Sequence, residues 1–402
     1  MEKTDFAMNN ALAGIQTPFY LYDMDLLAET AKAATEAAEK YGIELHYATK
    51  ANEDTRIISY LAQAGFGADC ISGGEVANAL KCGIPAQKIV FSGVGKSDSE
   101  ILTGLKAGIG CFNVESVHEL YILNAIAGKF GLKAGISLRV NPNIDAHTFR
   151  YITSGLEVNK FGLPDTEFDS FVEMLGKCPN LHFEGLHFHI GSQIPDVGKV
   201  CRDVCSSANK VIEWFRDHNL PVRSVNLGGG LGVDYDDPDA HRIPDFESWM
   251  SAIDRYLERR PGMSVHLEPG RSIVAQCGTL YSSVLFIKET AAKSFVILDA
   301  GMNDMIRPAL YGAYHRIDNI SALERPLLEA NRIYDVVGPV GESTDTWGKG
   351  RRLPVTVRGD LVAIRSAGAY GQTMSNRYNL RPEAQTVYSD RLWDATMKPS
   401  IL

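Results

Sequence analysis

The sequence lacks any run of 18 consecutive apolar residues, and its first residues, MEKTDFAMNN, contain no basic segment followed by an apolar one. We therefore expect neither a membrane-spanning helix nor a secretory signal. Positive charge is also in short supply, since 40 Lys and Arg stand against 49 Asp and Glu, a formal net charge of -9. This balance argues against nucleic acid and membranes as partners and favours a small molecule.

Cysteine pairs of the CxxC type are absent, and the seven cysteines show no spacing typical of structural zinc. An odd number of thiols fits a reducing compartment, so we expect a cytoplasmic protein. Cys201 and Cys205 would share one face of a helix, where we expect small, buried, apolar side chains. The dinucleotide fingerprint GxGxxG is also absent, because starting from Gly228 it requires glycine where Val233 stands.

Short β-like runs alternate with helical stretches from about residue 43 onward. The helical stretches, such as residues 74–82 and 200–218, carry apolar residues three or four apart. The strand candidates span residues 44–50, 66–72, 88–93, 110–115, 134–141, 183–191, 224–230 and 264–270. Strand–helix units repeated eight times over about 230 residues predict a (β/α)8 TIM-type barrel.

After residue 275 the pattern changes to strands joined by turns. The strand candidates are LYSSVLFIK, SFVILDA, RIYDVVG and DLVAIRS, which predict an all-β domain. The early run TPFYLYD at residues 17–23 is also strand-like, and we expect this β domain to take it up. The predicted fold class is α/β plus β, with an N-terminal strand and lead-in at 1–35, the barrel at 36–275 and a C-terminal β domain at 276–402.

The carboxyl ends of the barrel strands carry a consistent set of chemical groups, and active sites of such barrels lie at that end. Strand one ends in Lys50, strand six in His189, strand seven in Gly228–Gly230 and strand eight in Glu268–Arg271. A lysine can form a Schiff base, an imidazole can stack on a ring, and an acid can pair with a pyridine nitrogen. Glycines leave backbone N–H groups open to phosphate. Together these groups predict pyridoxal phosphate as the cofactor.

A metal site is the competing interpretation of the two nearby histidines, His187 and His189. They lie on the same face of a strand, but no cysteine or acid completes a ligand set at a familiar spacing. We therefore expect no metal ion in this site.

Nine longer motifs are spread over nearly the whole chain. They are TPFYLYD at 17–23, HYATKAN at 46–52, GADCISGGE at 67–75, HFHIGSQ at 187–193, NLGGGLG at 226–232, EPGRSIV at 268–274, RPALYGAYH at 307–315, GESTD at 341–345 and GAYG at 368–371. With these motifs the chain resembles the pyridoxal-phosphate decarboxylases of the alanine racemase fold type (fold type III), and most of all their diaminopimelate decarboxylase branch.

The resemblance implies a role for each matched residue. Catalytic positions are occupied by Lys50, His189, Glu268 and Gly341. The implied cofactor contacts are Lys50, Asp69, His189, Ser192, Gly229, Gly230, Glu268, Pro269, Gly270, Arg271 and Tyr370. The implied substrate contacts are Arg271, Arg307, Tyr311, Glu342 and Tyr370.

The resemblance also implies an activity, the decarboxylation of meso-2,6-diaminopimelate to L-lysine, the last step of bacterial lysine biosynthesis, by a homodimer with shared active sites. The amino-acid substrate suits the matched residues, because arginine forks grip carboxylates and Glu342 can take the distal ammonium group. Two alternatives remain open: a related decarboxylase or racemase with another amino acid as substrate, and a catalytically weakened regulatory paralogue.

One position departs from the family pattern. Members of the family usually have cysteine directly before the Glu-Ser pair, where this chain has Gly341. In the family this cysteine comes from the partner subunit and returns a proton after decarboxylation. We therefore expect loss of carbon dioxide to survive here and proton return to be impaired or to use another acid.

Overall fold

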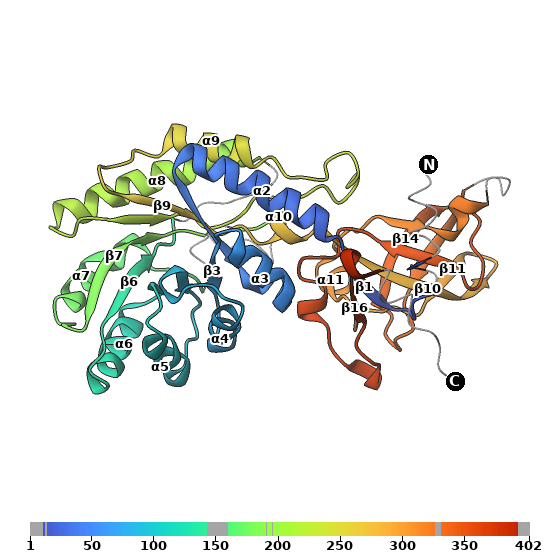
Figure 1. Cartoon of the computed structure of the whole chain (residues 1–402), viewed down its shortest axis with the longest axis horizontal. Coiled ribbons are helices and arrows are strands. Elements are labelled where there is room, and N and C mark those ends of the chain that lie inside the picture. The colour runs from blue at the N-terminus through green and yellow to red at the C-terminus, as the bar shows by residue number, and fades with distance from the viewer. Residues whose placement is uncertain are drawn as a thin grey trace. The chain divides into compact units, whose positions relative to one another are not determined.

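A computed structural model of the chain describes residues 11–12, 14–142, 160–189, 191–194, 196–325 and 331–392. It divides into two compact units (Figure 1). The barrel unit comprises Thr30–Gly232 and Pro244–Ile273, and the β unit comprises Met1–Glu29, Val233–Ile243 and Val274–Leu402. The domain limits expected from the sequence, at 35/36 and 275/276, remain a prediction.

Eight parallel strands close the barrel in chain order. They are β2 (Ile43–Ala48), β3 (Gly67–Cys70), β4 (Ile89–Phe91), β5 (Cys111–Val114), β6 (Ala134–Arg139), β7 (Leu181–His187), β8 (Ser224–Asn226) and β9 (Ser264–Leu267). The barrel closes where β2 pairs with β9, the first strand with the last. The eight strand candidates of the barrel are thus confirmed, and with them the predicted fold class.

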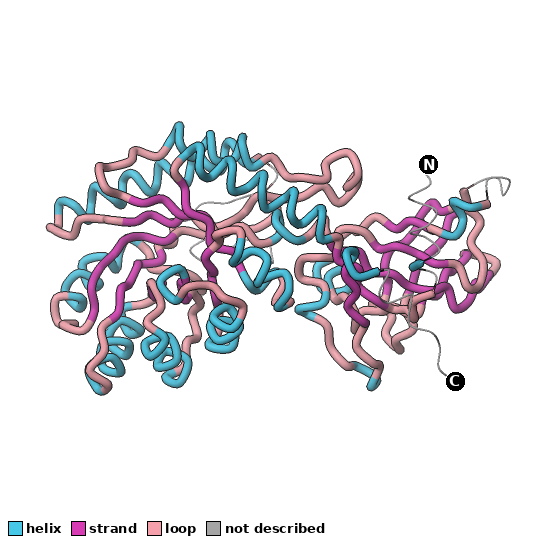
Figure 2. Tube along the Cα trace, viewed as in Figure 1, coloured by secondary structure: helices cyan, strands magenta, loops and turns pink. Residues whose placement is uncertain are grey.

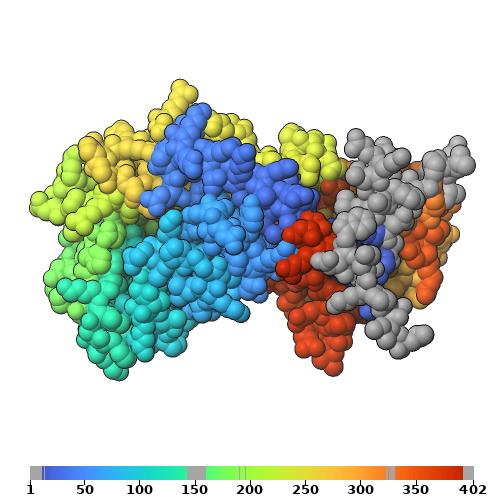
Figure 3. Space-filling model, in the orientation of Figure 1, coloured from blue at the N-terminus to red at the C-terminus, as the bar shows by residue number. Residues whose placement is uncertain are grey.

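Helices surround the barrel strands (Figure 2). They are α2 (Met24–Tyr41), α3 (Thr55–Gln63), α4 (Gly73–Lys81), α5 (Asp98–Ala107), α6 (Val117–Lys129), α7 (Phe168–Leu175), α8 (Val197–Asp217), α9 (Phe246–Tyr256) and α10 (Arg271–Val274). On the face shown in Figure 3, side chains of the helical layer cover the strands of this unit.

Polar residues fix where several of these helices begin. The side chains of Asp54, Ser72 and Ser116 accept hydrogen bonds from backbone N–H groups of the first turns of α3, α4 and α6. Ser97 and Glu100 form a reciprocal capping box at α5. Each cap satisfies a donor that a helix start leaves open, a contribution of about 1 kcal/mol. The caps therefore fix the short connections that follow the strands.

Two strand ends differ from the sequence expectation. Strand β2 ends at Ala48, and Lys50 lies in the 3-10 turn Thr49–Ala51. Strand β8 ends at Asn226, because Gly228 (φ 72°) and Gly230 (φ 126°) have left-handed backbone that a strand does not accommodate. Lys50 and the glycine residues thus lie in the loops that follow their strands.

The β unit contains an eight-stranded sheet and, among its described residues, the short helix α11 (Arg307–Tyr311). The strands are β1 (Phe19–Tyr22), β10 (Gly278–Glu289), β11 (Ser294–Leu298), β12 (Ile317–Asn319), β13 (Arg332–Val337), β14 (Thr346–Leu353), β15 (Leu361–Ile364) and β16 (Gln385–Tyr388). Strand β1 pairs with β10 and β16, so the β unit takes up the N-terminal strand as expected. The sequence missed three strands, β12, β14 and β16. The residues of β14, TWGKGRRL, are mostly polar and form an edge strand.

Among the described residues, no helix combines the length and the apolar character needed to cross a bilayer. The seven cysteines are all free thiols. Cys201 and Cys205 are buried on α8, as the sequence predicted.

Candidate active site

The barrel strands alternate between apolar and polar residues, and the polar set meets inside the barrel. On β9, Val265 and Leu267 are buried apolar residues, whereas His266 and Glu268 belong to the other face. Glu268 contacts His187 from β7, a strand that is not its neighbour in the barrel. Only side chains that point inward can meet in this way, so the interior holds the titratable groups.

Lys50 lies close to an acid at the carboxyl end of β3. Its Nζ is 3.8 Å from Oδ2 of Asp69, which is almost fully buried and accepts a hydrogen bond from Ser92 at 2.7 Å. Burial raises the pKa of Asp69 to about 7, and the negative charge of Glu268 adds to this rise. Asp69 is thus poised to exchange a proton near neutral pH beside the lysine amine.

Glu268 is held as an anion at the centre of the site. His187 donates from Nε2 to one carboxylate oxygen at 2.9 Å, and Asn226 donates from Nδ2 to the other at 2.7 Å. Burial alone would raise the pKa of Glu268, but the charge and hydrogen bond of His187 overcome this and lower it to about 2. A fixed buried carboxylate of this kind can hold a protonated ring nitrogen.

His189 follows β7 and is held by the glycine loop. The backbone N–H of Gly229 donates to Nδ1 of His189 at 3.3 Å, so this nitrogen is an unprotonated acceptor. Burial lowers the pKa of His189 well below its ordinary value, and the positive charges of Lys50 and Arg139 act in the same direction. The imidazole is therefore a neutral flat ring, suited to stacking rather than to anion binding.

The loop after β8 approaches neighbouring backbone too closely for any side chain. A Cβ at Gly229 would lie 2.5 Å from the backbone oxygen of Glu268, and one at Gly228 would lie 2.4 Å from that of Phe188. Side chains are thus excluded from this loop. The N–H groups of Gly228 and Gly229 donate within the protein, to Oδ1 of Asn226 at 2.9 Å and to Nδ1 of His189 at 3.3 Å, so these glycines shape the loop after the seventh strand, where such barrels bind phosphate.

An alanine at Gly229 is expected to weaken cofactor binding. The backbone must move to relieve the contact with the Glu268 carbonyl, and overpacking of this size costs about 1–3 kcal/mol, or roughly tenfold or more in affinity. Titration of the apoprotein with pyridoxal phosphate, followed by absorbance, measures this. Gly95→Ala is the matched control, because a Cβ there meets nothing within 4 Å. Equal affinities of the two variants for pyridoxal phosphate would contradict a role of the glycine loop in cofactor binding.

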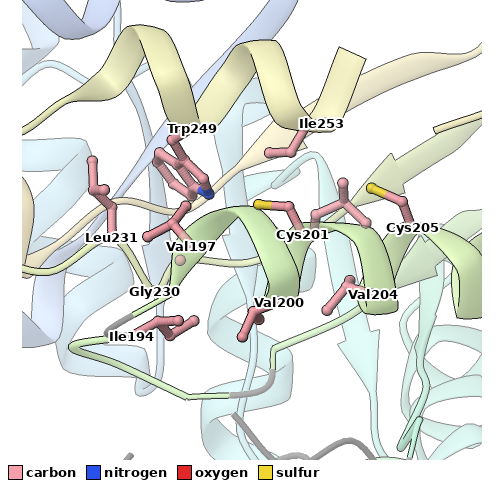
Figure 4. Close-up of a pocket in the computed structure, with 12 residues that line it drawn as sticks. Ile194, Val197, Val200, Cys201, Val204, Cys205, Gly230, Leu231, Trp249 and Ile253 are labelled. Carbon is pink, nitrogen blue, oxygen red and sulfur yellow. The ribbon is translucent and has the colours of Figure 1, made fainter. Parts of the chain in front are cut away.

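Behind the glycine loop lies a water-sized apolar cavity of ≈ 20 Å³ (Figure 4). It is lined by Ile194, Val197, Val200, Cys201, Val204, Cys205, Leu227, Gly229, Gly230, Leu231, Trp249 and Ile253. In Figure 4 the side chains of Trp249 and Ile253 on α9 face those of α8 across this space. The two helices therefore give the loop a packed apolar base, which fixes its backbone.

The segment after β9 supplies the remaining barrel residues. Pro269, Gly270 and Arg271 are buried, and Nε of Arg271 donates to Oγ of Ser192 at 3.1 Å. A Cβ at Gly270 would lie 3.0 Å from that of Ala48, so glycine permits close packing there. All the predicted cofactor contacts except Tyr370 belong to the barrel unit, and they lie around the carboxyl ends of its strands.

Five predicted residues belong to the β unit: Arg307, Tyr311, Gly341, Glu342 and Tyr370. Arg307 is buried at the start of α11 and contacts His315 through Nη1 at 2.7 Å. Glu342 is exposed and accepts a hydrogen bond from Tyr378 Oη at 2.6 Å. Tyr370 has φ 56°, a backbone conformation that is uncommon for a bulky residue and that favours a functional role. The approach of these residues to the barrel stays a prediction.

The residues of the barrel fit pyridoxal phosphate. Lys50 offers the amine, Glu268 a buried anion and His189 a neutral ring, and Gly228–Gly230 form a loop in which a Cβ would collide with neighbouring protein atoms. Sequence reasoning missed the partners of Glu268, namely His187 and Asn226. Their signal was present, because His187 ends β7 and Asn226 ends β8, the two strands that precede β9 around the barrel, and side chains at such strand ends meet.

Comparisons with known proteins agree with this site. The family model of the pyridoxal-binding domain of pyridoxal-dependent decarboxylases matches residues 26–275. The diaminopimelate decarboxylase of Bacteroides thetaiotaomicron is 45% identical over 379 residues, which cover 94% of this chain and 97% of that protein. That of Neisseria meningitidis serogroup A is 39% identical over 374 residues, covering 93% and 90%. A crystal structure of the Helicobacter pylori diaminopimelate decarboxylase with L-lysine superposes with a TM-score of 0.87 at 40% identity, covering 95% of this chain and 93% of that one.

Fold and site together define an enzyme that uses pyridoxal phosphate on a (β/α)8 barrel. Within that class, the chain belongs to the diaminopimelate decarboxylase family, a family of carboxy-lyases. The racemase and regulatory alternatives receive no support from these comparisons.

Proposed function

We propose that this chain converts meso-2,6-diaminopimelate to L-lysine and carbon dioxide. The observation that carries the proposal is the set of Lys50, His189 and Glu268 at the carboxyl ends of the barrel strands, in a chain matching diaminopimelate decarboxylases over 94% of its length. Pyridoxal phosphate, when bound, withdraws electrons from the substrate's α carbon. The protein's own part is to hold the cofactor and orient the carboxylate that leaves.

Each barrel residue has one task in this proposal. The Lys50 amine would hold the cofactor through its aldehyde, and Asp69, whose Oδ2 lies 3.8 Å from Nζ, can take or return the proton of the amine. Glu268 would keep the ring nitrogen protonated, because its own pKa of about 2 leaves it ionised at neutral pH. The neutral imidazole of His189 would stack on the ring and exclude water from it.

The substrate has a charged amino-acid centre at each end, and the proposed contacts complement both. Guanidinium groups of Arg271 and Arg307 can bind carboxylates through paired N–H groups. Glu342 is exposed and supplies a negative charge for the distal ammonium group. We further propose a cytoplasmic homodimer with shared sites, a setting that suits seven free thiols.

The assay that tests this function is release of carbon dioxide from a panel of amino acids. We expect meso-diaminopimelate to be preferred over lysine, ornithine and arginine, since each of those lacks the second carboxylate. Preference for any of these monocarboxylates would contradict the proposed substrate. Incubation of the protein with a D-amino acid, followed by measurement of the chirality of the product, separates decarboxylation from racemisation.

Gly341→Cys is expected to raise turnover. Gly341 is exposed, a Cβ there meets nothing within 4 Å, and its φ lies outside the left-handed region, so a thiol fits without strain. A positioned proton donor contributes roughly 10²–10⁴-fold, so a rise of about 10²-fold in kcat is expected if proton return limits the rate. Gly341→Ser is the control for size and polarity. Unchanged turnover in the cysteine variant would show that another group returns the proton.

A further inference from the structure

A second group of titratable side chains lies where the barrel closes. Glu44 and His46 are on β2, and His266 is on β9, the last strand of the barrel. Glu44 and His46 are two residues apart and so share a face of the strand, and Glu44 is the direct register partner of His266. The cluster thus connects the first and last strands of the barrel, although 220 residues separate its two histidines.

Three atoms of the cluster converge at the separation that metal ligands adopt. Nε2 of His46 lies 3.2 Å from Nδ1 of His266, and Oε2 of Glu44 lies 3.9 Å from the same Nδ1. All three ligand atoms lie within 4.8 Å of one another. Two ligands bound at about 2.0–2.1 Å to a tetrahedral zinc ion lie roughly 3.4 Å apart. An ion can therefore bridge these atoms with little movement.

Both histidines can present an unprotonated ring nitrogen to a metal ion, once the proton shared between Nε2 of His46 and Nδ1 of His266 has left the cluster. Oγ of Ser264 lies 2.8 Å from Nε2 of His266 and can accept a hydrogen bond from its N–H. In that tautomer the lone pair of Nδ1 points toward the cluster, the usual support for a metal-bound imidazole.

The cluster also has a route for entry. A cavity of ≈ 260 Å³ is lined by Glu44 and His46 together with Glu39 of α2, Gly67 of β3 and Lys88. The two carboxylates attract a cation, whereas Lys88 opposes it, and Nζ of Lys88 donates to the backbone oxygen of Gly65 at 3.2 Å. The acids therefore outnumber the one cationic group that lines the cavity among the described residues.

We propose that Glu44, His46 and His266 bind a zinc ion that links the first and last strands of the barrel. Two imidazoles and a carboxylate favour a borderline transition ion over Mg²⁺, which prefers oxygen ligands alone. Water completes the fourth position. The ion's role is structural, because its three ligands lie within β2 and β9, whereas Lys50 and Glu268 follow the carboxyl ends of these strands. An ion that binds the folded protein but not the unfolded chain raises the unfolding temperature.

The test is zinc binding by the holoenzyme after dialysis against chelator and removal of free cofactor. We expect one ion per chain by equilibrium dialysis with ZnCl₂, and an unfolding temperature that rises with zinc but not with MgCl₂. His266→Gln should lose the ion, and Glu44→Gln, a change at an exposed side chain, should bind at least about tenfold more weakly. Decarboxylase activity should be unchanged in Glu44→Gln.

His182→Gln is the matched control, because His182 also pairs with a glutamate, Glu184, at 3.1 Å but belongs to no group of three possible metal ligands among the described residues. That variant should bind zinc as the parent does. Failure of the parent to bind zinc, or retention of the same affinity in both His266→Gln and Glu44→Gln, would overturn the proposal. Circular dichroism of Glu44→Gln confirms that loss of zinc there is not loss of fold.

Discussion

Lys50→Ala is expected to reduce decarboxylation by at least about 10³-fold. Removal of a residue that acts covalently costs this much or more, because no neighbouring group can replace its amine. The Lys50 side chain is one-third exposed, and its buried neighbour Asp69 keeps the hydrogen bond from Ser92 and, with a pKa of about 7, can be neutral, so the fold should survive the truncation. The measurement is kcat for carbon dioxide release together with the unfolding temperature.

Two controls make this result specific. Lys106→Ala removes an exposed lysine from α5 and should leave kcat unchanged. Borohydride reduction of the holoenzyme followed by peptide mapping should label Lys50 in the parent protein. A label on any other lysine, or substantial turnover by Lys50→Ala, would rule out the proposed role.

Glu268→Gln is expected to lower kcat by roughly 10²-fold, the size typical for loss of one preorganised electrostatic stabiliser. The amide is nearly the same size, but it carries no charge to hold a protonated ring nitrogen, and only its oxygen can accept a hydrogen bond, from either His187 or Asn226. Steady-state kinetics should show the loss in kcat more than in KM. Cofactor absorbance gives an independent readout, because the protonation of the ring changes its spectrum.

Glu258→Gln is the control for Glu268, since Glu258 is an exposed acid of the same unit. A kcat for Glu268→Gln within twofold of the parent would contradict the role given to the buried carboxylate. A change confined to KM would instead assign Glu268 to binding alone. Either outcome would remove the electrostatic argument from the proposed mechanism.

The order of the elements could be predicted because the signals are local. Each barrel strand is a short buried run, and each following helix repeats apolar residues at helical spacing, as in α8. The strand ends were less certain, since Lys50 and the glycine loop lie beyond the strands. A strand ends where its backbone leaves the ladder, as at Gly228, and sequence alone gives no φ.

The sequence by itself determined the fold class, the cofactor chemistry and the family, because these depend on residue types in a fixed order along the chain. The tertiary structure alone decided the electrostatics. The pKa of Glu268 falls, that of Asp69 rises and the ring of His189 is neutral because of burial and partners many residues away. The pairing of His46 with His266 likewise depends on barrel closure, which brings together strands that are distant in sequence. Distance and burial determine these properties, and the local order of the residues specifies neither of them.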